Sequence, residues 1–255
     1  MATVSSAAPE RDDTPRLISA LARMVAWTLV AVLFAFLVNV YLTVWVGWPG
    51  PAAALGSEAG GAAWLQVALY GAAVAGAVLF VVASPARGLR QDNFAITAIA
   101  AYIARFAFWT VLLVGLADAV VSFLRVEELL VPLVGEQLTQ DLGRSQFRGV
   151  YLHLPLIAVS LALAALTRTL GFTWLAVLVV IAELQIVISR FVFSYEQAFM
   201  GDLVRFWYAG LFLFSSAYTL IEDGHVRVDV LYHGFSDRTR GMVNALGALL
   251  LGLPL

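Results

Sequence analysis

The hydrophobic positions of this 255-residue chain form long apolar runs that short polar breaks separate. Each run is close to the roughly 20 residues that a helix needs to cross a hydrocarbon core about 30 Å thick. The runs lack the alternation of membrane β-barrels, and a segment inside a bilayer must satisfy its own backbone hydrogen bonds, which favours helices. We therefore predict an all-α polytopic membrane protein. Seven spans are visible, at about residues 22–46, 62–83, 94–120, 150–167, 172–195, 203–221 and 240–255.

The composition agrees with the bilayer as the solvent of this chain. Hydrophobic residues make up 62% of the sequence and charged residues 13%, so a soluble fold would lack the polar side chains to cover its surface. The sequence has no cysteine, which excludes disulfides, thiolate metal sites and thiol catalysis. Its formal net charge of -2 argues against nucleic acid as a partner.

Arginine is unevenly distributed over the two sides of an alternating topology. The basic residues that gather on one side are Arg11, Arg16, Arg87, Arg90, Arg168, Arg227, Arg238 and Arg240. By the positive-inside rule this side is cytoplasmic, which places the N-terminus inside. The loop over residues 125–149 on the other side holds three arginines, but four acidic residues dilute their charge.

The two ends of the chain differ in character. Residues 1–16 are polar and predict a disordered cytoplasmic tail. The apolar run after them is too long for a cleavable signal peptide. The seventh run reaches Leu255 without a polar flank, from which we expect an eighth helix after residue 255.

A search for catalytic, phosphate-binding and metal-binding motifs finds none in the sequence. The three histidines, at positions 153, 225 and 233, are scattered, so only folding could assemble a metal site from them. We predict no metal, no cofactor and no enzymatic activity.

Of the ionisable residues that lie inside predicted spans, Arg105 and Glu183 are the two most informative. Arg105 and Glu183 each lie about eleven residues beyond the inner start of a span, which places both roughly 16 Å deep. Charged groups at this depth cost several kcal/mol unless they are paired or hydrated. We therefore predict a bridge between Arg105 and Glu183, with a structural role favoured over a proton relay.

The C-terminal third carries an ordered set of motifs. An Arg-Phe-Val-Phe string ends one span, and an acid and an arginine three residues apart begin the next. A His-Val-Arg-Val-Asp string follows in the next loop, and an Arg-x-Arg pair precedes the seventh run. The motif residues are Arg190, Phe191, Phe193, Asp202, Arg205, His225, Arg227, Asp229, Arg238 and Arg240.

This set resembles the small membrane subunit of tripartite ATP-independent periplasmic (TRAP) transporters, the DctQ-like family, over about residues 172–255. That family shows Arg-Tyr-Val-Phe after one helix and Trp-x-Glu-Glu-x-x-Arg at the start of the next, followed by His-Ile-Arg-Val-Asp and Arg-x-Arg. The middle motif departs from the pattern, because Phe199 replaces Trp and Gly201 replaces the first Glu. Asp202 and Arg205 stand in the places of the second acid and the arginine.

The resemblance implies a division into the tail, an N-terminal extension of about four transmembrane helices over residues 17–170, and a small-permease-like core over residues 171–255. It implies a subunit, in the bacterial inner membrane, of a secondary transporter that imports organic acids such as carboxylates with a sodium or proton gradient. The expected partners are a large TRAP permease, which the small subunit braces, a periplasmic substrate-binding protein and the lipid bilayer. The alternative is an autonomous membrane transporter or an intramembrane enzyme that uses Arg105 and Glu183.

Some motif residues have two interpretations that stay open. Asp202 and Arg205 could stabilise the first turn of a helix as an i, i+3 pair. In the other interpretation they contact the large permease or the docking binding protein. Arg227, Arg238 and Arg240 would also suit any cytoplasmic loop.

Overall fold

A computed structural model describes residues 16–56, 60–168, 171–195, 198–221, 232 and 234–252 of the chain. The described residues are helical and contain no strand, which confirms the all-α fold. The chain divides into two compact units, residues 1–100 and residues 101–255, and each is considered by itself below.

Within the part that the structure describes, five helical segments are long and apolar enough to cross a membrane. They are α1 (Arg16–Val44), α2 (Gly61–Ala83), α3 (Leu89–Val126), the segment Ser145–Leu166 and α8 (Phe172–Phe193). These five correspond to the first five predicted spans. Two short helices, α4 (Leu130–Val134) and α5 (Glu136–Gly143), lie between α3 and the fourth segment. The fourth segment consists of α6 (Ser145–Arg148), the π-helix η2 (Gly149–His153) and α7 (Leu154–Leu166).

The last two predicted spans also lie in helices. The sixth falls in α9 (Ala198–Ile221). The seventh, as far as residue 252, falls in α11 (Asp237–Gly247) and the π-helix η3 (Ala248–Gly252). That these helices cross the membrane stays a prediction.

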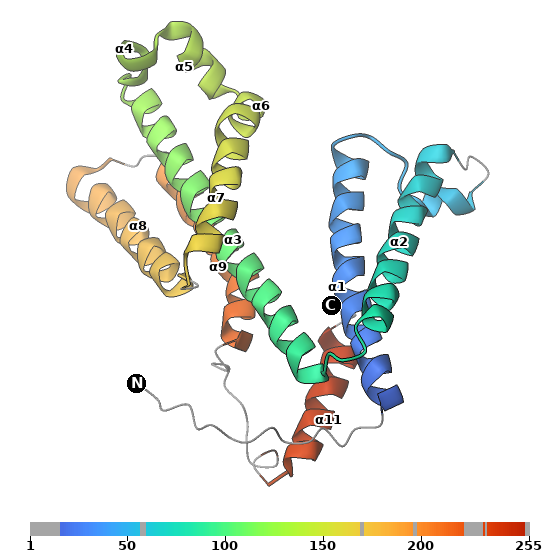
Figure 1. The fold of residues 1–255 in the computed structure, drawn as a ribbon. Coiled ribbons are helices and arrows are strands. Elements are labelled where there is room, and N and C mark those ends of the chain that lie inside the picture. Colours follow the sequence, from blue (N-terminus) through green and yellow to red (C-terminus); the bar gives the residue numbers. More distant parts are fainter. Residues whose placement is uncertain are drawn as a thin grey trace. The chain divides into compact units, whose positions relative to one another are not determined.

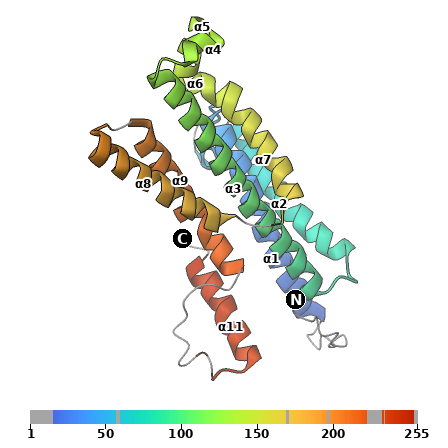
Figure 2. The ribbon, with the colours of Figure 1, turned by 90° about the vertical axis from the view of Figure 1, so that its left-hand side faces the viewer.

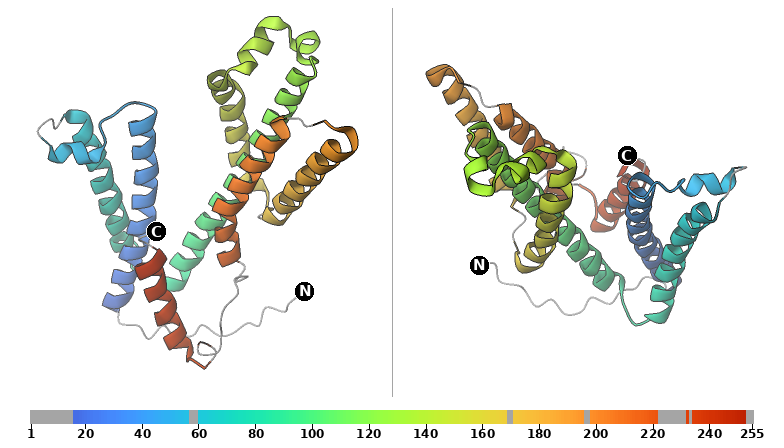
Figure 3. Two further views of the ribbon diagram at one scale, coloured as in Figure 1. Left: turned by 180° about the vertical axis from the view of Figure 1, so that it is seen from behind. Right: turned by 90° about the horizontal axis from the view of Figure 1, so that it is seen from above.

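The first unit is built on a hairpin of α1 and α2, which run side by side (Figures 1 and 3). A loop that contains the 3-10 helix η1 (Pro51–Leu55) joins them. The fully buried Gln66 fixes this loop, because its Oε1 accepts the Gly50 N–H at 2.9 Å and its Nε2 donates to Thr43 Oγ1 at 3.0 Å. Both ends of the side-chain amide are therefore satisfied inside an apolar hairpin.

The second unit has its core where α3, α8 and α9 meet. The buried residues of this core are Ala104, Phe108, Val111, Phe172, Leu175, Val179, Ala182, Met200, Leu203, Val204 and Trp207. Two glycines let α3 and α9 approach closely, and Figure 3 shows the two helices alongside each other. A Cβ on Gly115 would lie 2.3 Å from Trp207 Nε1, and one on Gly210 would lie 2.7 Å from Val111 Cγ1.

α7 packs along α3 in the same unit, as Figure 2 shows. Three side chains of α3, spaced i, i+3 and i+7 on one helical face, hold the C-terminal end of α7. Their hydrogen bonds are Tyr102 Oη to Leu161 O at 3.0 Å, Arg105 Nε to Ala164 O at 3.0 Å and Trp109 Nε1 to Thr167 Oγ1 at 3.0 Å.

Candidate subunit interface

α8 has one face turned into the protein and a broad face turned away from it. Its buried residues, Phe172, Leu175, Val179 and Ala182, recur at intervals of three and four, which puts them in one stripe against α3 and α9. The remaining face carries exposed large apolar side chains. Such a face is suited to lipid or to another membrane subunit.

Glu183 lies in the middle of α8, eleven residues after Phe172 and ten before Phe193. It is therefore about 16 Å from either end of the helix. Its side chain is exposed, and it makes no hydrogen bond or ion pair with any residue that the structure describes. Its exposed apolar neighbours along the helix are Val180, Ile181, Leu184 and Val187. An acid at the centre of a membrane helix costs about 2.5–3.5 kcal/mol on insertion scales, which makes Glu183 a candidate for a contact with another group.

The structure gives Arg105 a different partner from the predicted one. Its Nε donates to the carbonyl oxygen of Ala164. This is one of the last four carbonyls of α7, to which no N–H of the same helix donates. A cation at this position also complements the negative end of the helix dipole. The described residues contain no ion pair between Arg105 and Glu183, so the pairing of these two stays a prediction.

The end of α8 forms an exposed aromatic rim. Arg190, Phe191 and Phe193 are all exposed there, and Ser194 ends the helix with a φ of 52°. The next residue, Tyr195, donates its hydroxyl to Glu127 Oε1 at 2.9 Å. The Arg-Phe-Val-Phe string is therefore presented at the surface of the chain.

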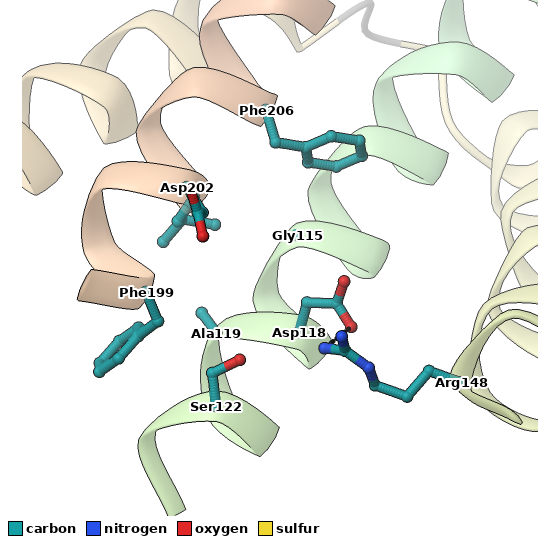
Figure 4. Close-up of a pocket in the computed structure, with 9 residues that line it drawn as sticks. Gly115, Asp118, Ala119, Ser122, Arg148, Phe199, Asp202 and Phe206 are labelled. Carbon is teal, nitrogen blue, oxygen red and sulfur yellow. Dashed lines mark hydrogen bonds and ion pairs between the residues drawn. The ribbon is translucent and has the colours of Figure 1, made fainter. Parts of the chain in front are cut away.

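The start of α9 carries the second motif. Asp202 and Arg205 form an i, i+3 pair, with Oδ1 and Nη1 3.4 Å apart, and both side chains are largely exposed. Beside them lies a cavity of about 260 Å³ between α3 and α9 (Figure 4). Its lining residues are Gly115, Asp118, Ala119, Ser122, Arg148, Phe199, Asp202, Leu203 and Phe206.

Asp118 organises the other wall of this cavity, as Figure 4 shows for its contact with Arg148. Its Oδ1 lies 3.1 Å from Arg148 Nη1 and 2.9 Å from His153 Nε2. Sequence reasoning missed this cluster, because its members are 30 and 35 positions apart in the chain and no local pattern joins them. In the described part of the chain, no group of three or more His, Cys, Asp or Glu side chains is placed to hold a metal ion.

The inner-loop motif can be followed only in part. His225, Arg227 and Asp229 lie outside the described residues. Arg238 is exposed in the first turn of α11, which Ser236 caps by accepting the Thr239 N–H at 3.3 Å. The last motif residue, Arg240, donates through Nε to Tyr232 O at 3.3 Å and so ties α11 to the preceding segment.

Comparisons with known proteins give one match. Residues 176–255 match the family model of the DctQ component of tripartite ATP-independent periplasmic transporters. Comparisons with curated proteins and with solved structures found no match. The matched residues include most of α8, all of α9 and α11, and the motif residues named above. Residues 176–255, about a third of the chain, are thus similar to the DctQ component of TRAP transporters, and further helices that are long and apolar enough to cross a membrane precede that segment.

Proposed function

We propose that this chain is the small membrane subunit of a TRAP-type secondary transporter that imports organic acids, such as carboxylates, with a sodium or proton gradient. The observation that carries the proposal is the DctQ match over residues 176–255. In this proposal the large permease subunit holds the substrate and ion sites, a periplasmic binding protein delivers the substrate, and this chain braces the large subunit. The chain resides in the bacterial inner membrane as a multi-pass protein with its N-terminus in the cytoplasm.

The exposed face of α8 is the contact surface for the large permease. It lies within the matched segment and combines large apolar side chains with Glu183 at mid-helix. A carboxylate is stable at that depth only when a partner supplies hydrogen-bond donors or a positive charge. The large permease therefore presents an Arg, a Lys or a polar donor side chain opposite Glu183.

The rim at the end of α8 and the start of α9 extends the same surface. Phe191 and Phe193 offer exposed aromatic rings, which are enriched in the cores of protein interfaces. Asp202 and Arg205 offer an exposed pair of opposite charges beside the α3–α9 cavity. Exposed charges of this kind steer association and fix register more than they add affinity.

Co-purification tests the proposed subunit role. The full chain is expressed with a TRAP-type large permease and a TRAP-type binding protein from the same genome, and the large permease is quantified after affinity purification of this chain. We expect a stoichiometric complex, and we expect uptake of a labelled carboxylate into liposomes only when all components are present. Uptake by this chain alone would show an autonomous transporter and overturn the proposal.

Substitution of Glu183 tests the contact surface. Removing one partner of a buried charged contact typically costs about 2–5 kcal/mol, so Glu183→Leu is expected to weaken the complex at least about 30-fold. Glu183→Gln keeps a hydrogen-bonding group and is expected to lose less. Val187→Leu, on the same exposed face, is the matched control and is expected to leave the complex intact. Equal recovery of the large permease with Glu183→Leu and with the control would exclude Glu183 from the interface.

A further inference from the structure

Three arginines of the first unit meet at one cavity near the start of α1. Arg16 and Arg23 come from α1, and Arg87 comes from the turn between α2 and α3. The cavity has a volume of about 380 Å³. Its other lining residues are Ser19, Ala20, Met24, Val81, Val82 and Pro85.

Arg23 is a fixed part of this cavity. Its side chain is only 4% exposed, and its Nε lies 2.6 Å from Asp92 Oδ2. Its Nη2 donates to Ser84 Oγ at 2.9 Å, and Ser84 in turn donates to Phe80 O at 2.6 Å. An arginine held by two partners in a buried position is preorganised and loses little conformational entropy when it binds an anion.

The positive charges around the cavity exceed the negative charge. Asp92 is 3% exposed and uses one carboxylate oxygen for Arg23 and the other for Arg87, whose Nε lies 2.9 Å from Oδ1. One carboxylate therefore faces two guanidinium groups. Arg16 adds a third, and it makes no ion pair with any described residue. Of the described residues that line the cavity, none is acidic.

Donors are left over for a ligand. A guanidinium has five N–H groups in a planar fork that matches the oxygens of a phosphate. Arg87 commits its Nε to Asp92, and its guanidinium carbon lies 5.5 Å from the centre of the Phe80 ring. Its side chain is 38% exposed, and its two terminal nitrogens make no hydrogen bond with any described residue.

The position and the walls of the cavity identify the kind of anion. α1 begins at Arg16 and has the length and composition of a membrane span, so the cavity lies at a membrane–water boundary. Met24, Val81 and Val82 give it an apolar wall that continues along the exposed apolar surface of the α1–α2 hairpin. A ligand that matches both the arginines and the apolar wall has an anionic head and hydrocarbon chains.

We propose that the cavity bounded by Arg16, Arg23 and Arg87 binds the phosphate group of an anionic phospholipid, whose acyl chains lie against the apolar surface of α1 and α2. Basic pockets between membrane helices are known to suit acidic lipid headgroups. Ordinary positive-inside arginines are exposed in loops, whereas here one arginine is buried and two share a buried carboxylate. The N-terminal helices thereby gain a lipid-binding role that is independent of the DctQ segment.

Lipid titration of the full chain tests this site. The delipidated protein in neutral detergent is titrated with phosphatidylglycerol or with phosphatidylcholine, and bound lipid is counted by native mass spectrometry. We expect saturable binding of one phosphatidylglycerol and much weaker binding of phosphatidylcholine. The double substitution Arg16→Gln with Arg87→Gln spares the buried Arg23–Asp92 pair. With about 1 kcal/mol per arginine near a membrane surface, it is expected to weaken phosphatidylglycerol binding about 30-fold.

Two controls decide the outcome. Arg168→Gln removes an exposed arginine elsewhere in the chain and is expected to leave binding unchanged, whereas Arg16→Lys with Arg87→Lys keeps the charge and is expected to retain most of it. Inorganic phosphate at millimolar concentration is expected to leave the lipid bound. Unchanged binding by the double glutamine variant, an equal loss with Arg168→Gln, or full displacement by inorganic phosphate would each overturn the proposal.

Discussion

Gly115 is the position where one added methyl group tests the packing of the DctQ segment against α3. A Cβ at this position would lie 2.3 Å from Trp207 Nε1, 2.9 Å from Trp207 Cδ1 and 3.2 Å from Phe206 Cδ1. Trp207 is 3% exposed and donates its indole N–H to Val111 O at 3.2 Å, one turn before Gly115. The indole cannot keep this hydrogen bond and also make room for a methyl group.

The magnitude follows from three opposing contributions to the free energy of unfolding. Replacing glycine by alanine in a helix interior stabilises by up to about 1 kcal/mol. Overpacking a buried site costs about 1–3 kcal/mol, and loss of the indole hydrogen bond costs about 0.5–1.5 kcal/mol. We therefore expect Gly115→Ala to lower the free energy of unfolding by about 1–3 kcal/mol.

Unfolding in mixed detergent micelles, followed by tryptophan fluorescence, measures this change. Gly201→Ala in α9 and Gly76→Ala in α2 are matched controls, because nothing lies within 4 Å of the added Cβ at either position. Both controls are expected to be neutral or slightly stabilising. A Gly115→Ala variant as stable as these controls would refute the proposed close approach of α3 and α9.

Other perturbations test the polar contacts within the two units. Arg105→Ala is expected to cost about 1–2 kcal/mol in thermal unfolding, because the Ala164 carbonyl at the end of α7 loses its donor, and Arg105→Lys should recover part of the loss. The charge swap Arg105→Glu with Glu183→Arg tests the predicted bridge. If the double variant recovers the complex assembly that each single variant loses, the pair is supported. If it does not, Ala164 remains as the partner of Arg105. Gln66→Leu is expected to cost about 1–3 kcal/mol and to speed hydrogen exchange at Gly50, whose N–H loses its buried acceptor; unchanged exchange at Gly50 would contradict this role.

The sequence was sufficient to predict the helices because membrane spans have a strong local signal. Runs of apolar residues near 20 in length predict helices without any knowledge of the partners that they pack against. The residues at which the helices begin and end were less predictable. α3 runs from Leu89 to Val126, well past the predicted span 94–120 at both ends. At its start the helix gains Leu89, Arg90 and Gln91, which favour helical conformation. At its end it continues through residues 121–126, of which only Ser122 and Arg125 are polar.

The polar contacts depend on tertiary structure, so the sequence could not supply them. The partner of Arg105 is a backbone carbonyl, which becomes available only where α7 ends beside α3. The Arg23–Asp92 pair joins positions 69 apart in the chain. One local signal did exist, because Arg23 stands at the inner end of the first predicted span, where a charged residue is stabilised by a partner or by water.

Arg23 and Glu183 are charged residues of two candidate membrane helices, and their surroundings differ. Arg23 is buried, and residues of its own unit satisfy it through Asp92 and Ser84. Glu183 is exposed at the centre of α8 and has no partner among the described residues. Because a solitary carboxylate in lipid is unfavourable by several kcal/mol, Glu183 is the residue on which we base the proposed contact with another subunit. Glu183 falls within the segment that matches the DctQ model, whereas Arg23 and its partner Asp92 both fall before it, in the first unit, which completes this ion pair by itself.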